Sequence, residues 1–352
     1  MRHTAHTEDQ PLVRKRLLTD AQIDEFRTNG VLVVPNLLSS DEVARARTGL
    51  HDELRRYEVD HNDLENTGDN LKKLSSTGGA GGILDLFYPS WRLRVAENAD
   101  TFAAITDLWA ATYAANHPDF PHPFGEFDPK QGYMYINRVC YRVPDAISVK
   151  FGAKKSRPMQ RSLTPHLDCC PSNLYESGKA VPRWRPIQCI TVLTDNTEPN
   201  TGGFECVPGF HREFRDYFAK NQLPEPDNTT SRPPVCLGDF SPLRMQEDRD
   251  VIRRYQHINC TAGSVIFFDW RLPHANSYKH VGSTPREVIY SGFLPRVPMN
   301  QRYAEEQLRR YSLRLLPTDH WQKNDEDKTV DEHFSAHQFS SLGERLMAIQ
   351  PW

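Results

Sequence analysis

The most informative short segment of the chain is Thr164-Pro-His-Leu-Asp168, which places a histidine and an aspartate two positions apart. In an extended strand, side chains at positions i and i+2 lie on the same face. His166 and Asp168 would therefore offer an imidazole nitrogen and a carboxylate oxygen to one point. A His-x-Asp pair arises easily by chance, and two ligands are too few for a tight metal site, so a third donor is needed.

His274 is the third candidate ligand, in the segment Phe267-Phe-Asp-Trp-Arg-Leu-Pro-His274-Ala-Asn276. Two histidines and one carboxylate on one face of a metal leave open coordination positions, and this arrangement suits non-haem Fe(II). We therefore predict His166, Asp168 and His274 as the metal ligands and the catalytic residues.

Arg286 follows His274 by twelve positions, and Gly282-Ser283 between them can turn the chain back as a hairpin. Arg286 would then lie on the neighbouring strand and face the same cavity, where a guanidinium can hold a carboxylate through two parallel hydrogen bonds. A five-carbon diacid such as 2-oxoglutarate could chelate iron at one end and meet Arg286 at the other. Asn276 is the second candidate cofactor contact. Taken alone, Arg286 is equally consistent with a surface strand position.

Together these residues resemble the pattern of the Fe(II)/2-oxoglutarate-dependent oxygenases, and more closely that of the phytanoyl-CoA dioxygenase family. The resemblance covers roughly residues 20–295 and includes four further segments: Asn29–Ser39, Val192–Asp195, Gly202–His211 and Gly263–Asp269. It implies a double-stranded β-helix (jelly-roll, cupin-like) core, Fe(II), 2-oxoglutarate as co-substrate and O2. The implied reaction hydroxylates, desaturates or oxidatively cyclises a substrate and releases succinate and CO2.

The distribution of apolar runs predicts a mainly β fold with flanking α-helices. Capping-box spellings at Thr19 and Ser39 predict the starts of two helices, and a further helix is expected over Phe102–Tyr113. We expect a disordered tail over 1–16, a single oxygenase domain over 17–316 with its β core at about 131–294, and a C-terminal extension over 317–352. The expected strands are Val31–Val34, Tyr133–Val139, Gln188–Thr194, Phe204–Val207, Ser264–Asp269 and Glu287–Phe293.

Composition excludes several classes of protein. The chain of 352 residues has 43 Lys and Arg against 46 Asp and Glu, so its net charge of −3 gives no reason to expect nucleic acid or a membrane surface as partner. There is no apolar run near 18 residues and no apolar N-terminal signal. Seven cysteines without a C-x-x-C pair argue against a disulfide framework and favour the cytoplasm. The sequence leaves the oligomeric state open.

Basic residues flank the proposed metal strand, and they predict a small anionic substrate, such as a carboxylate-bearing metabolite. Arg183 and Arg185 follow the strand as candidate substrate contacts, and an acyl-CoA 2-hydroxylase of phytanoyl-CoA type is the alternative. From other classes, a zinc hydrolase with the same three ligands or a non-catalytic jelly-roll binding module remain open. The basic residues before the strand are Lys150, Lys154, Lys155, Arg157 and Arg161.

Three other features are interpreted as structural. The glycine-rich segment Ser75–Gly82 lacks the Gly-Lys-Ser/Thr ending of a phosphate-binding loop, so it is expected to be a loop or an active-site lid. His211, in a Pro-Gly-x-His segment, is interpreted as a turn residue, and Cys169 and Cys170 as packing residues.

Overall fold

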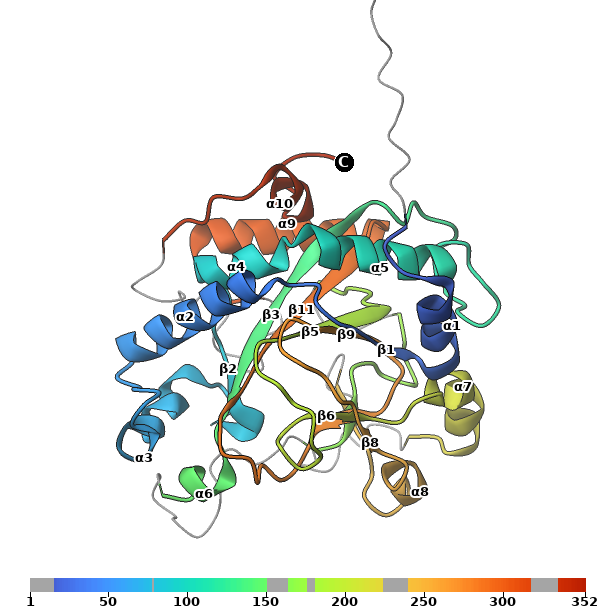
Figure 1. The fold of residues 1–352 in the computed structure, drawn as a ribbon. Coiled ribbons are helices and arrows are strands. Elements are labelled where there is room, and N and C mark those ends of the chain that lie inside the picture. The colour runs from blue at the N-terminus through green and yellow to red at the C-terminus, as the bar shows by residue number, and fades with distance from the viewer. Residues whose placement is uncertain (1–15, 78, 151–163, 176–180, 224–239, 318–334) are drawn as a thin grey trace, which may run out of the picture.

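The computed structural model describes residues 16–77, 79–150, 164–175, 181–223, 240–317 and 335–352. Two antiparallel sheets form its centre and helices surround them (Figure 1). The six-stranded sheet contains, in spatial order, β1 (Val31–Val34), β9 (Val265–Asp269), β5 (Ile187–Val192), β11 (Arg286–Pro295), β3 (Gly132–Arg142) and β2 (Ile83–Leu84). The five-stranded sheet contains β7 (Ser241–Pro242), β4 (His166–Leu167), β10 (His274–Asn276), β6 (Phe204–Cys206) and β8 (Gln256–His257).

All the strands expected from the sequence are present, but the prediction of a mainly β chain is only partly confirmed. Helices hold 36% of the described residues and strands 20%, because several strands are only two or three residues long and helices fill both ends of the chain. The helices are α1 (Asp20–Asn29), α2 (Ser40–Arg56), α3 (Leu64–Thr67), α4 (Ser90–Ala96), α5 (Ala99–Ala111), α6 (Asp145–Ser148), α7 (Phe210–Lys220), α8 (Arg249–Ile252), α9 (Pro298–Leu313) and α10 (Ser341–Leu346), with 3-10 turns η1 (Gly68–Leu74) and η2 (Ala80–Gly82).

The two predicted capping boxes are confirmed. Thr19 and Ser39 each accept a hydrogen bond from the backbone three residues on, and Gln22 and Glu42 bond back to them. Helix α1 ends at Gly30, whose φ of 69° suits glycine. His211 lies against this turn with its Nε2 atom 3.1 Å from the Arg27 carbonyl oxygen, which agrees with the interpretation of His211 as structural.

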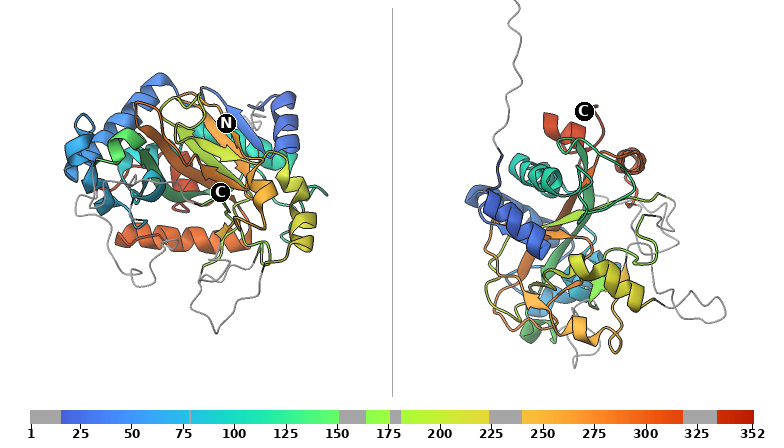
Figure 2. Two further views of the ribbon diagram at one scale, coloured as in Figure 1. Left: turned by 90° about the horizontal axis from the view of Figure 1, so that it is seen from below. Right: turned by 90° about the vertical axis from the view of Figure 1, so that its right-hand side faces the viewer.

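Strands β3 and β11 form the long central pair of the six-stranded sheet, from Arg286 opposite Arg142 to Pro295 opposite Gly132. Both strands are buried along nearly their whole length. Helices α4, α5 and α9 cover one face of the sheet (Figures 1 and 2), and the second sheet lies on the other side. Because both faces are covered, these strands read as near-continuous rather than alternating apolar runs.

The cysteines differ from expectation at one position. Cys170 is disulfide-bonded, although the cysteine spacing gave no sign of a disulfide, since spacing along the chain does not show which sulfur atoms meet in the fold. The free thiols among the described residues are all buried: Cys140, Cys169, Cys189, Cys206 and Cys260. Among the described helices, none combines the length and apolar character required to cross a membrane.

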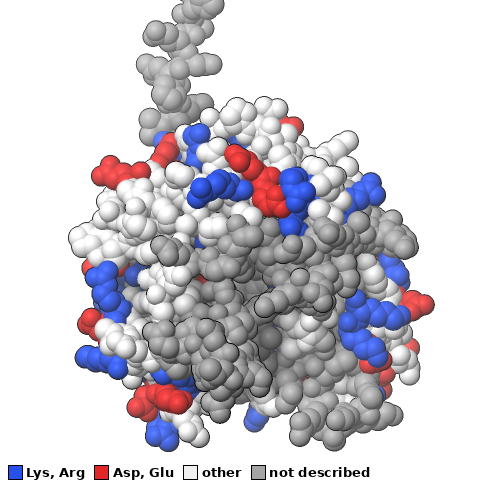
Figure 3. All heavy atoms as spheres, turned by 180° about the vertical axis from the view of Figure 1, so that it is seen from behind, with Lys and Arg blue, Asp and Glu red and all other residues white. Residues whose placement is uncertain are grey.

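Charged side chains of both signs alternate over the face of the molecule shown in Figure 3. Lys and Arg lie beside Asp and Glu around its edge, and no large area of one sign is visible among its described residues. On the described part of this face, positive and negative side chains are therefore close to balanced, as they are in the composition.

Residues 335–352 pack against the body of the protein through Glu97 at the end of α4. The Glu97 carboxylate, 5% exposed, accepts hydrogen bonds from the Ser340 amide and hydroxyl, both at 2.7 Å, and lies 3.1 Å from His337 Nε2. At the end of the chain, the Trp352 indole donates to the Gly132 carbonyl at 2.7 Å. This last segment is thus an integral part of the packed structure.

We expect Glu97→Ala to lower the free energy of unfolding by about 2–4 kcal/mol, because it removes a buried carboxylate and strands the donors of Ser340 and His337. Chemical denaturation measures the change. Glu213→Ala is the matched control: Glu213 pairs with Arg254 on the surface, so its loss should cost no more than about 1 kcal/mol. Equal effects of the two substitutions would contradict the anchoring role of Glu97.

Candidate metal centre

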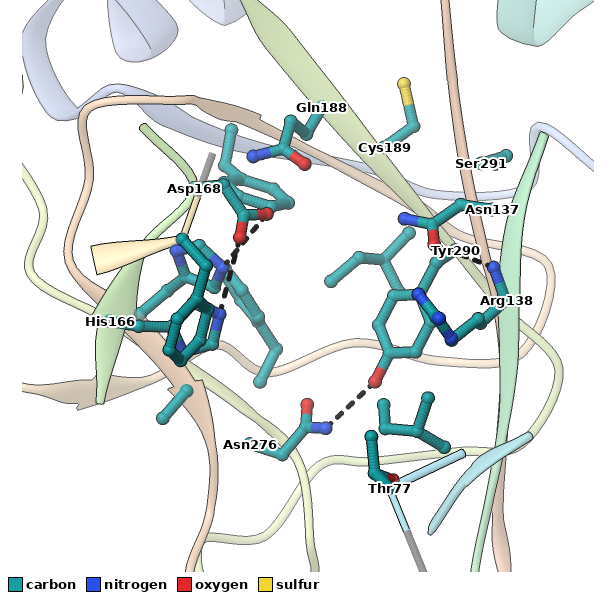
Figure 4. Close-up of a pocket in the computed structure, with 17 residues that line it drawn as sticks. Thr77, Asn137, Arg138, His166, Asp168, Gln188, Cys189, Asn276, Tyr290 and Ser291 are labelled. Carbon is teal, nitrogen blue, oxygen red and sulfur yellow. Dashed lines mark hydrogen bonds and ion pairs between the residues drawn. The ribbon is translucent and has the colours of Figure 1, made fainter. Parts of the chain in front are cut away.

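The pairing of two short strands brings the two predicted histidine ligands together. Strand β4 pairs with β10 in antiparallel register, with His166 directly opposite His274. Residues opposite each other in such a pair project from the same face, and the centroids of the two imidazole rings lie 4.4 Å apart. Asp168 follows β4 by one residue and turns toward both rings (Figure 4).

The three ligand atoms lie close enough to share one metal ion. Asp168 Oδ1 is 3.5 Å from His166 Nε2, and Asp168 Oδ2 is 3.6 Å from His274 Nε2. One donor atom from each residue lies within 4.8 Å of the others, and no other group of three or more His, Cys, Asp or Glu side chains in the described ranges meets this condition.

Backbone carbonyls fix which nitrogen of each histidine faces the site. His166 Nδ1 lies 2.8 Å from the Thr164 carbonyl oxygen, and His274 Nδ1 lies 2.9 Å from the Leu272 carbonyl oxygen. A carbonyl only accepts hydrogen bonds, so in each neutral ring Nδ1 carries the proton and Nε2 keeps its lone pair. Both histidines use the carbonyl two residues earlier, and both lone pairs point toward Asp168. Such partners orient metal-binding histidines.

Electrostatics keep His166 and Asp168 in the protonation states that a metal requires. Burial, followed by the nearby His274, lowers the pKa of His166 to about 4, so this imidazole is neutral at pH 7. Burial alone would raise the pKa of Asp168. Contacts with His274, and then the positions of His166 and Arg185, outweigh burial and lower the pKa of Asp168 below its usual range. A neutral imidazole lone pair beside a carboxylate is a donor set that fits Fe(II).

The ligands open onto a cavity of about 230 Å³ between the two sheets. His166 and Asp168 lie on one side of it, and Asn137, Arg138 and Tyr290 lie on the other (Figure 4). Much of the remaining wall is apolar and comes from Ile83, Ile190, Phe204, Phe240 and Phe268. This volume can hold a small organic molecule, and its apolar wall limits the entry of water.

Arg286 lies beside Asn276, as a shared cofactor site would require. Its Nη1 donates to Asn276 Oδ1 at 3.2 Å and to Cys140 Sγ at 3.5 Å. Asn276 Nδ2 donates to Tyr290 Oη at 2.8 Å, and Asn276 and Tyr290 line the cavity whereas Arg286 is not among its lining residues. Arg286 is 3% exposed, so it is a buried cation one layer behind these two side chains.

Arg183 and Arg185, the predicted substrate contacts, are not among the residues that line the cavity. Arg185 Nη2 lies 3.8 Å from Asp168 Oδ2, and its Nη1 donates to Gln188 Oε1 at 2.8 Å. Both guanidinium groups lie over the ring of Tyr135. In this position Arg185 supports a metal ligand, and contact of either arginine with substrate stays a prediction. The basic residues Lys154, Lys155, Arg157 and Arg161 lie outside the described residues, and Lys150 pairs with Glu65.

Sequence reasoning missed Tyr290, Arg138 and Gln188, which all line the cavity. Tyr290 had a detectable signal, because it lies four residues after Arg286 on one strand and even spacing keeps side chains on one face. Arg138 and Gln188 had none, since their position depends on how β3 and β5 pair with distant strands.

Comparison with known proteins also points to a dioxygenase. No family model matches the chain. The ectoine dioxygenase of Stutzerimonas stutzeri (strain A1501) is 23% identical over 308 residues, which span 82% of this chain and 85% of that protein.

Two solved structures share the fold. The GlcNAc-inducible gene 2 protein of Candida albicans is 12% identical, with a TM-score of 0.67 over 97% of this chain and 78% of that one. Hypothetical protein JW0805 of Escherichia coli is 14% identical, with a TM-score of 0.66 over 94% of this chain and 81% of that one.

The similarity to a dioxygenase over most of both chains, joined to the His, Asp and His site, defines the class: the chain is a dioxygenase that uses Fe(II), 2-oxoglutarate and O2. The predicted resemblance to the phytanoyl-CoA dioxygenase type of these enzymes is confirmed.

Removing any one ligand should abolish metal binding. We expect His166→Ala, Asp168→Ala and His274→Ala each to weaken Fe(II) binding at least about 100-fold, since three protein ligands are the minimum for such a site. Anaerobic titration with Fe(II), and with Mn(II) as a redox-inert probe, measures binding directly. His117→Ala is the control because His117 is a partly exposed histidine outside the site. Full iron affinity in the His274 variant would show that the ligand assignment is wrong.

Proposed function

We propose that the chain binds Fe(II) through His166, Asp168 and His274 in a double-stranded β-helix core and oxidises a C–H bond of a small carboxylate-bearing metabolite. Hydroxylation is the default outcome, and desaturation or oxidative ring closure are its variants. The observation that carries the proposal is the convergence of two histidine Nε2 atoms and one carboxylate at the wall of a cavity of about 230 Å³. We place this reaction in one domain over residues 17–316, against which residues 335–352 pack, in the cytoplasm and with no nucleic-acid or membrane partner.

Bound iron, 2-oxoglutarate and O2 supply oxidative decarboxylation to succinate and CO2 and the oxidising power to break a C–H bond. The protein positions the substrate and excludes water. His166 and His274 hold the metal through orientations that their backbone carbonyls fix, and Asp168 is steadied by Arg185. The phenylalanines of the wall keep the site dry.

We assign the distal carboxylate of 2-oxoglutarate to Arg286 and Asn276. Burial alone would lower the pKa of Arg286, but Cys140 and Tyr290 beside it raise the pKa above the usual value, so the group remains a cation. Within the described residues, the hydrogen-bond partners of Arg286 are the uncharged side chains of Cys140, Asn276 and Tyr290, and a buried cation of this kind is suited to an anionic ligand. Asn276 and Tyr290, hydrogen-bonded to each other at the cavity wall, would offer further donors to that carboxylate.

The size of the cavity favours a small acid over an acyl-CoA. About 230 Å³ accommodates a metabolite of a few carbons, whereas an acyl-CoA would have to leave its nucleotide outside. The similarity to a dioxygenase named for ectoine, itself a small cyclic carboxylate, supports the same choice. Acyl-CoA 2-hydroxylation of phytanoyl-CoA type stays the alternative.

A zinc hydrolase and a binding module without turnover are the rivals from other classes. Neither of these functions requires a buried arginine at position 286. Succinate formation that requires Fe(II), 2-oxoglutarate and O2 together would exclude both, and a protein that binds these components without forming succinate would contradict the proposal.

Substitution of Arg286 should weaken 2-oxoglutarate binding without changing metal binding. Arg286→Lys keeps the charge but loses the planar fork, and Arg286→Ala loses both, so the 2-oxoglutarate KM should rise in that order. Truncation of one partner of a buried charge pair costs roughly 2–5 kcal/mol, which corresponds to about 30-fold or more for the alanine variant.

The readout is the 2-oxoglutarate dependence of succinate release, with Fe(II) affinity measured in parallel. Arg47→Ala is the control: Arg47 pairs with Glu287, the next residue along β11, and its loss should leave the 2-oxoglutarate KM unchanged. An unchanged KM in Arg286→Ala would remove Arg286 from the cofactor site.

A further inference from the structure

The glycine-rich segment Ser75–Gly82 reaches the cavity, where Thr77 forms part of the wall. Asp85, directly after β2, secures this segment. Its carboxylate accepts hydrogen bonds from the Ser76 amide at 2.5 Å and from the Ser76 hydroxyl at 3.2 Å. The same carboxylate accepts from Arg138 Nε at 2.6 Å. One aspartate therefore ties a loop at the cavity to a cation at the cavity.

Arg138 is a buried cation, and not all of its N–H donors form hydrogen bonds within the described residues. Its side chain is 8% exposed and lies over the ring of Phe87, 5.5 Å from the centroid. Within the described residues, its Nη2 is buried and has no hydrogen-bond partner. An unsatisfied buried donor costs free energy, and a guanidinium offers five N–H donors, of which Asp85 takes only the Nε side.

The Arg138 side chain extends into the cavity on the side opposite His166 and Asp168 (Figure 4). A molecule held at Arg138 would lie across the cavity from the metal ligands. This is the placement that an oxidised substrate requires, because its C–H bond must face the metal while its recognised group is bound elsewhere.

We propose that Arg138 binds the carboxylate of the substrate that is oxidised, and that Asp85 is a positioning residue which holds the guanidinium and the glycine-rich segment in place. The inference rests on the proposed function and deepens it by naming the group that selects an acid. A carboxylate fits because it accepts charge-assisted hydrogen bonds from guanidinium, and the Nη2 donor of Arg138 is left over beside the ion pair with Asp85.

Arg138 and Arg286 serve different carboxylates. In the β3 and β11 pairing, Val139 lies opposite Ile289 and Arg142 lies opposite Arg286. Arg138 is thus displaced by about four residues from Arg286 along the sheet, roughly 13 Å at strand spacing. Arg286 lies behind Asn276, whereas Arg138 lines the cavity itself, so we assign 2-oxoglutarate to Arg286 and the substrate to Arg138.

The test uses small carboxylic acids, each paired with its primary amide: ectoine, proline and benzoate. Wild-type protein with Fe(II), 2-oxoglutarate and O2 is assayed for the increase in succinate release that each compound causes. At least one acid should stimulate release with a KM about tenfold or more below that of its amide, the range expected for a charge-assisted hydrogen bond. Arg138→Gln should raise the KM of that acid about 10- to 100-fold and remove its advantage over the amide.

The variants separate recognition from structure. Arg138→Lys should restore part of the preference for the acid. Asp85→Asn should raise the acid's KM by a smaller factor and add little when combined with Arg138→Gln, because Asp85 acts through Arg138. Arg142→Gln is the matched control, since Arg142 is a buried, ion-paired arginine of the same strand that is not among the cavity-lining residues. Its acid KM should match that of wild type.

The outcomes distinguish this inference from the proposed function. If no acid in the set stimulates succinate release, or if acids and amides act equally in the wild type, the carboxylate site is overturned. A selective rise of the 2-oxoglutarate KM in Arg138→Gln also overturns it, because Arg138 would then hold the co-substrate. If wild-type protein forms no succinate even without added substrate, the proposed function itself fails.

Discussion

The register between β4 and β10 is the constraint on which the site depends. His166 lies opposite His274, and a slip by one residue would turn one ring away from the other. These strands are only two and three residues long, so their own hydrogen bonds cannot define the register. The neighbouring strand β6 and the long six-stranded sheet must hold them in place. A small, precise site is thus supported by a large, well-packed layer.

Burial of the three ligands costs hydration free energy. The neighbouring groups that offset this cost also orient the ligands for a metal ion. Two imidazoles and a carboxylate in an apolar cavity would lose hydration free energy without partners. Backbone carbonyls satisfy the Nδ1 protons, and Arg185 lies near Asp168. What remains unsatisfied is the inner side of each ligand, where the lone pairs converge. The free energy that binding a metal would recover is therefore greatest at that point.

The sequence predicted the local features of this protein well and the long-range ones poorly. Capping boxes and apolar runs identified helices and strands because those signals depend on neighbours a few residues apart. The His166 and Asp168 spacing was readable for the same reason. The cavity positions of Arg138 and Gln188 depend on which strands pair. The charge of Arg185 is visible in the sequence, whereas its packing over Tyr135 is not. The site assignment came from recognising a family pattern that already contains the pairing.

The link between β9 and β10 shows how tertiary contacts position His274. Asp269 ends β9 fully buried, and burial alone would raise its pKa, but Arg271 lowers it, so the carboxylate stays charged. It accepts from Arg271 Nε at 2.8 Å and from the Tyr113 hydroxyl at 2.6 Å. Its amide donates to the Gly30 carbonyl at 2.7 Å. The turns that follow helices α1 and α5 thereby fix the start of the five-residue path to His274.

This path also supplies the carbonyl that orients the histidine. Leu272, whose amide donates to the Asp269 carbonyl at 3.0 Å, presents its own carbonyl to His274 Nδ1. Hydrogen bonds therefore connect Asp269 to the imidazole through Leu272, and the anchor lies in the six-stranded sheet and the turns after α1 and α5 rather than in the short sheet. The helices that made the chain less β-rich than its sequence predicted are part of what holds the second histidine at the metal site.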